Sequence, residues 1–292
     1  MGRKRESKHH GVIVVDKPAG MTSHDVVSKT RKAYDTRAVG HAGTLDPMAT
    51  GVLVIGIGRG TKLVPWLTAM DKTYETTVRL GVATHSLDAD GDVVQEKSVP
   101  PLTLESVAAV ASSFVGTHPQ RAPVVSAIKV EGRALHERVR RGEDVEAPVR
   151  DVTLHSVEML DVSETEIRAR LHCGKGFYVR SFGRDLAEKL GTVGHLSALR
   201  RTASGRFSLA EAATLDALPV PVLTLAEAAS RLMPTVNANE RGVDDARHGR
   251  RIAAEDVSAM PDGDAALIHE GELVAVVYPE EGKLRVRRGF VG

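Results

Sequence analysis

The stretch GHAGTLDPMATG, residues 40–51, combines three glycines and a proline with one histidine, His41, and one carboxylate, Asp46. Glycine accepts left-handed backbone angles and proline fixes φ, so both residues favour sharp turns. The run GVLVIGIG at residues 51–58 follows at once, and its apolar, β-branched composition predicts a buried strand. We therefore expect a turn that leads into this strand and directs the Asp46 side chain into a cleft.

The overall composition limits the class of protein without identifying a partner. The chain has 292 residues, 42% of them hydrophobic, which suits one large domain or two unequal ones. Its 39 Lys and Arg residues nearly balance 38 Asp and Glu residues. The single cysteine, Cys173, excludes an internal disulfide and favours a reducing compartment, so we expect a cytoplasmic protein. No apolar run approaches the roughly 20 residues of a membrane span, so we expect no membrane contact.

The spacing of apolar residues predicts strands and helices that do not alternate strictly. Strands are expected at residues 11–18, 51–58, 73–82, 151–162 and 166–182, and helices at 23–34, 63–72, 104–116, 181–191 and 225–233. After residue 234 the pattern changes to short strands, with a hairpin around residues 279–282. This predicts an α+β fold with a basic, disordered tail (1–10), a large domain (11–234) and a small β-rich C-terminal domain (235–292).

Three local patterns suggest binding sites but favour simpler interpretations. IGIGRGTK, residues 55–62, lacks the order of glycine, lysine and threonine that a phosphate-binding loop requires. DADGD, residues 88–92, has valine at the calcium-loop positions that need glycine and glutamate, which favours a hairpin turn with solvated acids. Cys173 sits in a predicted strand, where a free cysteine usually packs as a small hydrophobe. We therefore expect neither a cofactor nor a bound metal.

Two segments carry an excess of basic side chains. Residues 121–141 hold six Lys or Arg against two Glu, and they form either a solvated helix face or a surface that follows the phosphates of a nucleic acid. Charge alone does not decide between these two interpretations. KLRVRR, residues 283–288, places Lys and Arg on one face of a predicted strand, which suits an edge that contacts a nucleic-acid backbone or only improves solubility.

Together, several motifs resemble one family, the bacterial tRNA pseudouridine synthases that act on uridine 55 of the T arm. The resemblance is carried by residues 40–51, by DKTYETTVRLG (71–81) with SLDADG (86–91), and by SAIKVEGRALHERVRRG (126–142). It continues through CGKGFYVRSFGRDLAEKLG (173–191) and LRRTASGRF (199–207). The order and spacing match over residues 11–218. The end of the chain is similar to a short RNA-binding PUA module. This family resemblance implies a mixed, mostly antiparallel sheet with flanking helices, a tRNA partner, and no cofactor; we expect a monomer.

The resemblance also implies roles for individual residues. Catalytic roles fall on Asp46, Tyr74, which would stack on the target base, and Arg180, which would pair with Asp46. The expected substrate-binding residues are His41, beside the flipped nucleotide, Lys129 in the basic segment 121–150, Lys175, Tyr178 and Leu199. Tyr178 and Arg180 are two residues apart, so on a strand they would share one face.

The chemistry of the reaction explains why these residue types are needed. Conversion of uridine to pseudouridine breaks the N1–C1′ bond, turns the uracil, and joins C5 to C1′. Positive charge develops near C1′ as the bond weakens, and an ionised carboxylate stabilises it by electrostatics or by covalent attack. Burial would neutralise such a carboxylate, and we expect Arg180 to offset this effect on Asp46. Stacking on Tyr74 would offset the cost of pulling the base out of the RNA.

Two other functions remain open at this stage. A non-catalytic RNA-binding protein could use the same basic surfaces. A glycoside hydrolase could use a carboxylate pair such as Asp46 with Asp88 or Asp90, provided that the two carboxyl groups lie about 5 to 10 Å apart. The single well-placed acid and its basic surroundings favour the RNA isomerase.

Overall fold

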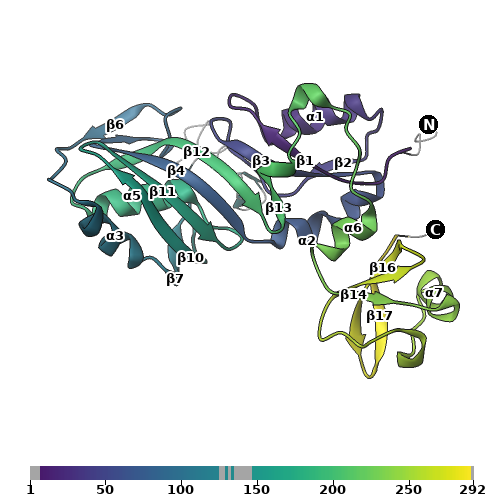
Figure 1. Ribbon diagram of the computed structural model, residues 1–292. Coiled ribbons are helices and arrows are strands. Elements are labelled where there is room, and N and C mark those ends of the chain that lie inside the picture. Colours follow the sequence, from purple (N-terminus) through teal and green to yellow (C-terminus); the bar gives the residue numbers. More distant parts are fainter. Residues whose placement is uncertain (1–6, 125–128, 131–132, 135–146, 291–292) are drawn as a thin grey trace.

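The computed structural model describes residues 7–124, 129–130, 133–134 and 147–290. A large part is built on one long sheet, and a smaller part, residues 235–290, is called here the C-terminal β region (Figure 1). The large part contains β1 Gly11–Lys17, α1 Ser23–Ala33, β2 Val39–His41, β3 Thr50–Ile57, η1 Gly58–Leu63, α2 Val64–Ala69, β4 Lys72–Leu80, β5 Val82–Thr84, β6 Val93–Glu96, α3 Leu104–Ser112, β7 Gly116–Arg121, β8 Lys129–Val130, β9 Arg133–Ala134, β10 Val149–Val162, β11 Glu166–Cys173, α5 Val179–Lys189, β12 Gly194–Ser204, β13 Phe207–Ser208, η2 Leu209–Glu211, η3 Leu215–Ala217 and α6 Leu225–Ser230. The C-terminal β region contains β14 Thr235–Asn237, α7 Glu240–Arg247, η4 Ala254–Asp256, β15 Ala265–His269, β16 Glu272–Glu280 and β17 Lys283–Gly289. These elements confirm the predicted α+β fold class.

The large sheet is mostly antiparallel, as predicted. Its strand order is β1-β3-β12-β4-β11-β10-β7, with β2 paired to β3 and β13 paired to β12. Among its described strands, only β3 and β12 run parallel, with Thr50 opposite Arg200 and Gly51 opposite Arg201. Because β3 follows residues 40–51 directly, this pairing brings the Asp46 turn beside β12 and β4.

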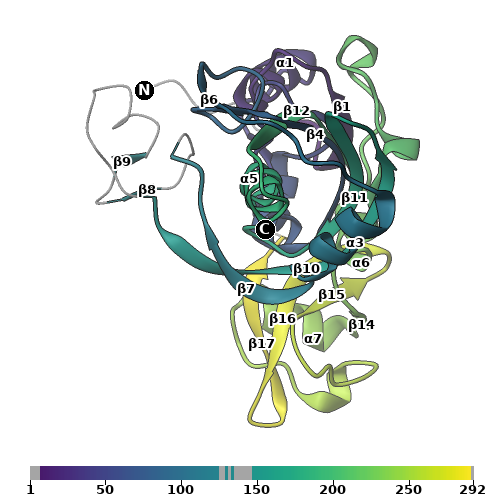
Figure 2. The same ribbon diagram turned by 90° about the vertical axis from the view of Figure 1, so that its left-hand side faces the viewer.

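Helices pack against this curved sheet. Seen end-on, the sheet bends around α5, and α3 lies alongside (Figure 2). The core between them includes Phe114, Phe182, Leu186 and Leu196. Helix α1 closes a second core with β1, β2 and β3. No helix within the described residues combines the length and the apolar character needed to cross a membrane.

The C-terminal β region packs against the turn and helix that precede β4. Trp66 of α2 donates from Nε1 to Asp264 Oδ2 at 2.9 Å, and Lys62 Nζ donates to Gly289 O at 2.7 Å. The Phe290 ring is buried in a hydrophobic cluster that also contains residues of β1, β3 and α6. The two parts therefore share a core as well as polar contacts.

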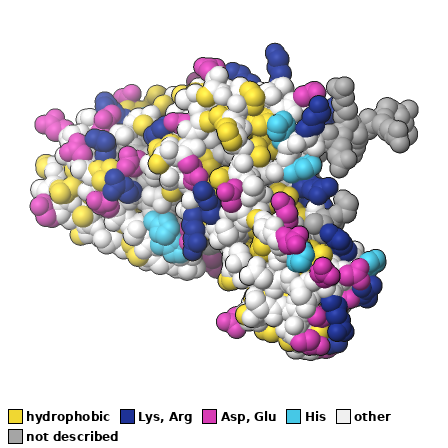
Figure 3. Space-filling model, turned by 45° about the vertical axis from the view of Figure 1, so that its right-hand side comes forward, with side chains coloured by type: hydrophobic (Ala, Val, Ile, Leu, Met, Phe, Trp, Pro, Cys, Tyr) yellow, Lys and Arg dark blue, Asp and Glu magenta, His cyan; other side chains and the backbone are white. Residues whose placement is uncertain are grey.

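The basic strand near the end of the chain is β17, an edge of the four-stranded sheet. As predicted, Leu284 faces inward and the Arg side chains face outward. Arg285 pairs with Glu280 at 3.2 Å, and Arg287 pairs with Asp264 at 2.8 Å. Figure 3 shows the same interspersion of basic and acidic side chains over this region. Much of the local positive charge is thus neutralised within the protein.

The helices predicted at residues 63–72 and 104–116 end earlier, at Ala69 and Ser112, and one predicted strand is wrong in its boundary. The strand expected at residues 166–182 ends at Cys173 as β11, and α5 begins at Val179. Gly174 and Gly176 separate the two, and Gly176 has φ +88°, which a strand residue does not adopt. Tyr178 and Arg180 therefore come from a helix start and not from one face of a strand.

The contact between β3 and β12 yields a stability prediction. Gly51 has φ +102°, and a Cβ added there would lie 2.2 Å from the carbonyl oxygen of Arg201. We expect Gly51→Ala to lower the free energy of unfolding by on the order of 3 kcal/mol, because backbone strain and the clash add together. Urea denaturation followed by circular dichroism measures the loss.

A matched control separates the effect of backbone strain from the effect of the close contact with Arg201. Gly282 has φ +75°, but a Cβ there would have nothing within 4 Å. We expect Gly282→Ala to cost only about 1 kcal/mol, since it adds backbone strain alone. Equal losses in the two variants would show that the β3–β12 approach imposes no extra constraint at Gly51.

Candidate active site

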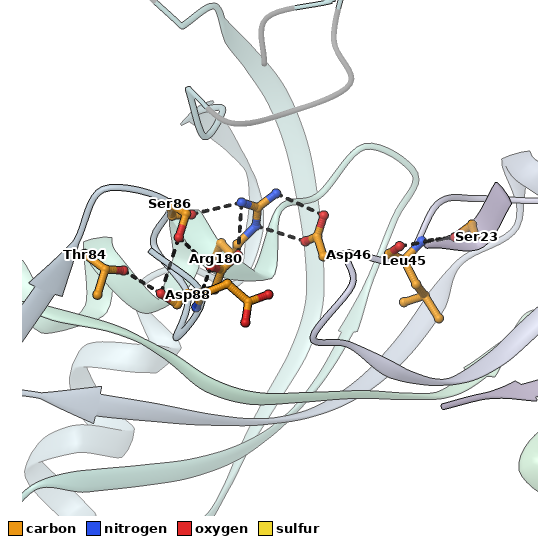
Figure 4. Close-up of polar contacts among 8 residues, drawn as sticks. Ser23, Leu45, Asp46, Thr84, Ser86, Asp88 and Arg180 are labelled. Carbon is orange, nitrogen blue, oxygen red and sulfur yellow. Dashed lines mark hydrogen bonds and ion pairs between the residues drawn. The ribbon is translucent and has the colours of Figure 1, made fainter. Parts of the chain in front are cut away.

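The Asp46 turn is held in place from both sides. Gly43 and Gly51 have φ +92° and +102°, which confirms that glycine is needed for this path. Ser23, at the start of α1, accepts a hydrogen bond from Leu45 N at 2.9 Å and donates to Leu45 O at 3.2 Å (Figure 4). The residue before Asp46 is therefore tied to a helix start, which limits how far the carboxylate can move.

A buried lysine supports the other side of the turn. Lys17, at the end of β1, donates from Nζ to Pro47 O at 3.2 Å and to Met21 O at 2.6 Å. Burial lowers the pKa of Lys17 to about 8, although the Asp46 carboxylate opposes this shift. The ammonium group therefore supplies both hydrogen bonds to the loop and positive charge near Asp46.

Asp46 forms a two-point ion pair with Arg180. Arg180 Nε lies 3.0 Å from Asp46 Oδ2, and Nη2 donates to Oδ1 at 3.1 Å (Figure 4). The Arg180 side chain is 5% exposed and the Asp46 side chain 32% exposed. A two-point contact fixes the direction of the carboxylate as well as its charge. The predicted pairing of these two residues is confirmed.

The start of α5 is anchored so that Arg180 can reach the turn. Tyr178 N donates to Gln120 Oε1 at 2.8 Å, and Gln120 Nε2 donates back to Tyr178 O at 3.1 Å. One turn later, Ser181 Oγ donates to Arg121 O at 2.7 Å. Strand β7 thus fixes the first turn of the helix that presents the guanidinium.

Arg180 also contacts a second carboxylate, that of Asp88. Arg180 Nη1 lies 3.3 Å from Asp88 Oδ2 and donates to Ser86 O at 2.9 Å. Ser86 Oγ and Asp90 N both donate to Asp88 Oδ1, as Figure 4 shows for Ser86. Asp88 is buried, so the prediction that the acids of residues 88–92 are solvated is wrong for this one. The Arg180 contact and the surrounding donors explain how a carboxylate is accommodated there.

The electrostatic balance at Asp46 differs from the expectation. Its pKa is raised above the usual 3.8, because burial outweighs the attraction of Arg180, and the Asp88 carboxylate adds to the rise. The sequence argument predicted that Arg180 would offset burial, but the offset is incomplete. The attraction of Arg180 and of Lys17 is therefore opposed by two effects, burial and the negative charge of Asp88.

A pocket of about 310 Å³ opens beside this ion pair. Six of the predicted site residues line it: Asp46, Tyr74, Lys175, Tyr178, Arg180 and Leu199. Burial raises the pKa of the Tyr74 hydroxyl, while Arg201 opposes the rise. The pocket therefore combines an aromatic ring, an apolar wall and a carboxylate held by a guanidinium.

Two predicted residues are not among those that line the pocket. His41 ends β2 with its ring centroid 5.4 Å from that of His24, in an edge-on contact. Its Nδ1 is buried without a hydrogen-bond partner in the described part of the chain, and burial lowers its pKa. Lys129 begins β8, but its side chain lies outside the described residues, as does most of the basic segment 121–150. The roles of His41 and Lys129 stay predictions.

Cys173 has the structural role that the sequence favoured. Its side chain is buried, and Sγ donates to Lys72 O at 3.7 Å. Burial raises the pKa of the thiol to about 12, so it stays protonated at neutral pH. A protonated thiol is a poor nucleophile, which argues against covalent chemistry at this residue.

Comparison with known proteins identifies the family. A family model for the N-terminal domain of TruB family pseudouridylate synthases matches residues 31–179, about half of the chain, and a model for the tRNA pseudouridylate synthase B C-terminal domain matches residues 180–243. The chain belongs to the TruB family of pseudouridylate synthases. It is therefore an isomerase, as its resemblance to this family predicted.

Similar sequences cover nearly the whole chain. A protein of Corynebacterium diphtheriae named tRNA pseudouridine synthase B is 42% identical over 94% of this chain and 93% of its own length. A protein of the same name from Corynebacterium jeikeium is 47% identical over 80% of each chain. These relatives extend the TruB family assignment beyond the two matched domains.

Solved structures support the fold. A chain in "Crystal Structure of a Cbf5-Nop10-Gar1 Complex" is similar with a TM-score of 0.75 and 24% identity, and the similarity covers 97% of this chain and 85% of that one. At this identity the similarity shows only that the two chains share a fold. The pseudouridine-synthase fold predicted for this TruB family chain is therefore confirmed.

Several residues of this TruB family site escaped the sequence argument. Asp88 was assigned to a solvated turn, although the carboxylate contacts Arg180. Lys17, Lys72 and Arg201 were not singled out, yet all three are buried close to the Asp46 turn or in the pocket wall. The sequence signal that could have found them is a charged side chain within or next to an apolar strand, as in VIVVDKP at residues 12–18.

The raised pKa of Asp46 predicts the acid side of the pH profile. If Asp46 must be ionised for turnover, kcat/KM falls as the pH decreases through its pKa, and this begins at a higher pH than for an ordinary aspartate. We expect Asp88→Asn to move this acid limb to lower pH, because it removes a negative charge that raises the pKa of Asp46. Initial rates measured across pH with the tRNA substrate follow the shift.

Asp90→Asn is the matched control for this experiment. Asp90 is exposed, and only its backbone N–H contacts Asp88. We expect its profile to overlay that of the wild type. If Asp88→Asn also left the acid side of the pH profile unchanged, coupling between the two carboxylates through Arg180 would be excluded as a cause of the raised pKa of Asp46.

Proposed function

We propose that this enzyme converts uridine 55 in the T arm of tRNA to pseudouridine. The observation that carries the proposal is the Asp46–Arg180 pair at the edge of a pocket that also contains Tyr74. The relatives at 42% to 47% identity are named tRNA pseudouridine synthase B, which supports tRNA as the substrate. The combination of one fixed carboxylate and one pocket for a planar base suits cleavage of an N-glycosidic bond.

The geometry suggests a distinct role for each of these residues in the reaction. Asp46 meets the sugar of the flipped uridine, either by attack on C1′ or by stabilising the positive charge that forms there. Arg180 keeps the carboxylate oriented by its two contacts. Tyr74 stacks on the base, and Tyr178 and Leu199 contribute apolar surface to the pocket wall.

Other parts of the chain extend this proposal to the RNA. Lys175 lines the pocket and suits a contact to a phosphate near the flipped nucleotide. The segment 121–150, with Lys129, would follow the RNA backbone, and residues 235–292 would act as a PUA-like RNA-binding domain. We further propose that the enzyme works as a monomer in the cytoplasm, where its tRNA substrates are.

The glycoside hydrolase hypothesis is less well supported. Asp88 is absent from the residues that line the pocket, and its carboxylate is taken up by Arg180, Ser86 and the Asp90 backbone. A second acid in that position would not reach a bound sugar. Asp46 is therefore the carboxylate that can act on a substrate bound in the pocket.

The decisive experiment is the isosteric substitution Asp46→Asn. We expect the variant to bind tRNA with wild-type affinity and to release no tritium from C5-labelled uridine in the T arm, because the charge that stabilises C1′ is gone. Asp262→Asn, an exposed acid in the C-terminal β region, is the matched control and should keep full turnover. Turnover by Asp46→Asn would refute the assignment of Asp46.

The position of modification is tested separately. Pseudouridine mapping of tRNA from cells that lack this protein should show uridine at position 55, and restoration of the wild-type gene should recover pseudouridine there. Restoration of Asp46→Asn should not. A non-catalytic RNA-binding role predicts the opposite, namely that both genes restore every RNA-dependent phenotype.

A further inference from the structure

Two buried cations that the Asp46–Arg180 pair does not include also line the pocket wall. In the register of β4 and β12, Arg201 lies directly opposite Tyr74, so these two side chains share a face of the sheet. Lys72 is two residues before Tyr74 on β4, which places it on the same face. Both cations line the pocket.

Among the described residues, Arg201 is held by main-chain oxygens and forms no ion pair with an acid. Arg201 is only 1% exposed. Nε donates to Val52 O at 2.6 Å, and Nη2 donates to Gly43 O at 3.1 Å. A guanidinium has five N–H donors, so these two bonds leave donors available for Tyr74 and for a ligand.

Lys72 is arranged in a similar way. The residue is 6% exposed, and Nζ donates to Thr68 O at 2.7 Å and to Met70 O. Burial lowers the pKa of Lys72 to about 8, so the ammonium group is still mostly charged at neutral pH. A lysine ammonium has three donors, and one remains for a ligand in the pocket.

The two cations approach each other at the Gly43 backbone. A Cβ added to Gly43 would lie 3.6 Å from Arg201 Nη1 and 3.7 Å from Lys72 Cε. In the part of the chain that the structure describes, neither side chain forms an ion pair with a carboxylate, although Asp71 is near enough to oppose the lowering of the Lys72 pKa. Buried charges usually have a partner of opposite sign, because leaving water costs several kcal/mol per ion. The missing negative charge points to the substrate.

We propose that Lys72 and Arg201 stabilise the negative charge that develops on the uracil when its bond to the ribose breaks. This inference rests on the proposed function. As N1–C1′ breaks, its electron pair goes to the uracil ring, where N1, O2 and O4 share the charge. Donors from two buried cations stabilise such an anion most strongly where water is excluded. They also retain the detached base while it turns.

The remaining steps keep the composition of the substrate unchanged. C5 of the uracil anion bonds to C1′, the hydrogen on C5 then leaves as a proton, and N1 takes up a proton. No oxidant, reductant or second substrate is needed. The site thus separates two charges along one bond, with Asp46 on the sugar side and Lys72 with Arg201 on the base side.

The test compares two leaving groups in the same T-arm RNA. 5-Fluorouridine carries an electron-withdrawing fluorine, which makes its base a better leaving group that depends less on the enzyme. In single-turnover assays we expect Lys72→Met to slow consumption of the uridine N-glycoside by about 10²-fold, as for loss of one donor to a developing anion, and to slow the 5-fluorouridine RNA much less. Nuclease digestion and chromatography measure both RNAs in the same way.

Conservative variants and binding controls complete the experiment. Lys72→Arg and Arg201→Lys keep the charge and should recover much of the rate that Lys72→Met and Arg201→Gln lose. RNA affinity and thermal unfolding of each variant show whether it folds, and Lys72→Met serves as the primary variant because Arg201 also supports the backbone.

Each outcome separates this inference from the proposed function. Equal losses for the two RNAs would overturn leaving-group stabilisation. A loss of RNA affinity with an unchanged single-turnover rate would also overturn it, and would show that the cations hold a phosphate of the flipped nucleotide instead. If the wild-type enzyme left T-arm uridine unchanged, the proposed function itself would fail.

Discussion

The active site depends on the Arg180 guanidinium, which lies between two carboxylates. One of them, Asp46, faces the pocket, and the other, Asp88, is buried behind it. A buried arginine with one acid would form a closed, neutral pair. With two acids, these three side chains together carry a net negative charge when both acids are ionised, and the partly exposed Asp46 carboxylate presents part of that charge to the pocket, close to the positive charge of Lys17. The site thus keeps a carboxylate reactive while its position is fixed.

The rest of the fold serves to bring these three residues together from distant parts of the chain. Asp46 comes from a turn between β2 and β3, Asp88 from the β5–β6 hairpin, and Arg180 from the first turn of α5. The parallel contact of β3 with β12 and the Gln120 clamp on Tyr178 set the positions of two of these segments. None of the three segments would hold its side chain in place alone.

Local sequence patterns were sufficient for the parts of this site that depend on local chemistry. The glycines around Asp46 predicted a turn, and the apolar runs predicted most strands of the sheet and the α+β class. The extended strand through Arg180 was wrong, because apolar residues around Phe177 obscured the break made by Gly174 and Gly176. The C-terminal β region was expected from its short strands, and its hairpin at residues 279–282 is present as β16 and β17.

The remaining features depend on contacts between distant residues, which a local pattern does not contain. Asp88 looks like any acid in a polar turn until α5 brings a guanidinium to it. Lys72 ends the predicted helix at residues 63–72 and Arg201 lies where no strand was predicted, and only the pairing of β4 with β12 and the path of the Gly43 turn bring the two together and bury them. Family resemblance pointed to Asp46 and to its pairing with Arg180, but not to Asp88 and Lys17, whose charges also act on the pKa of Asp46.

The contact of the C-terminal β region with α2 connects this region to the pocket wall. Trp66 joins α2 to Asp264, and the same helix ends at the carbonyl groups that receive the Lys72 ammonium. Residues 235–290 therefore brace one wall of the pocket without lining it. An enzyme that lost this region would lose support at the pocket wall where we propose that the base is held, so its defect would extend beyond the proposed attachment to RNA.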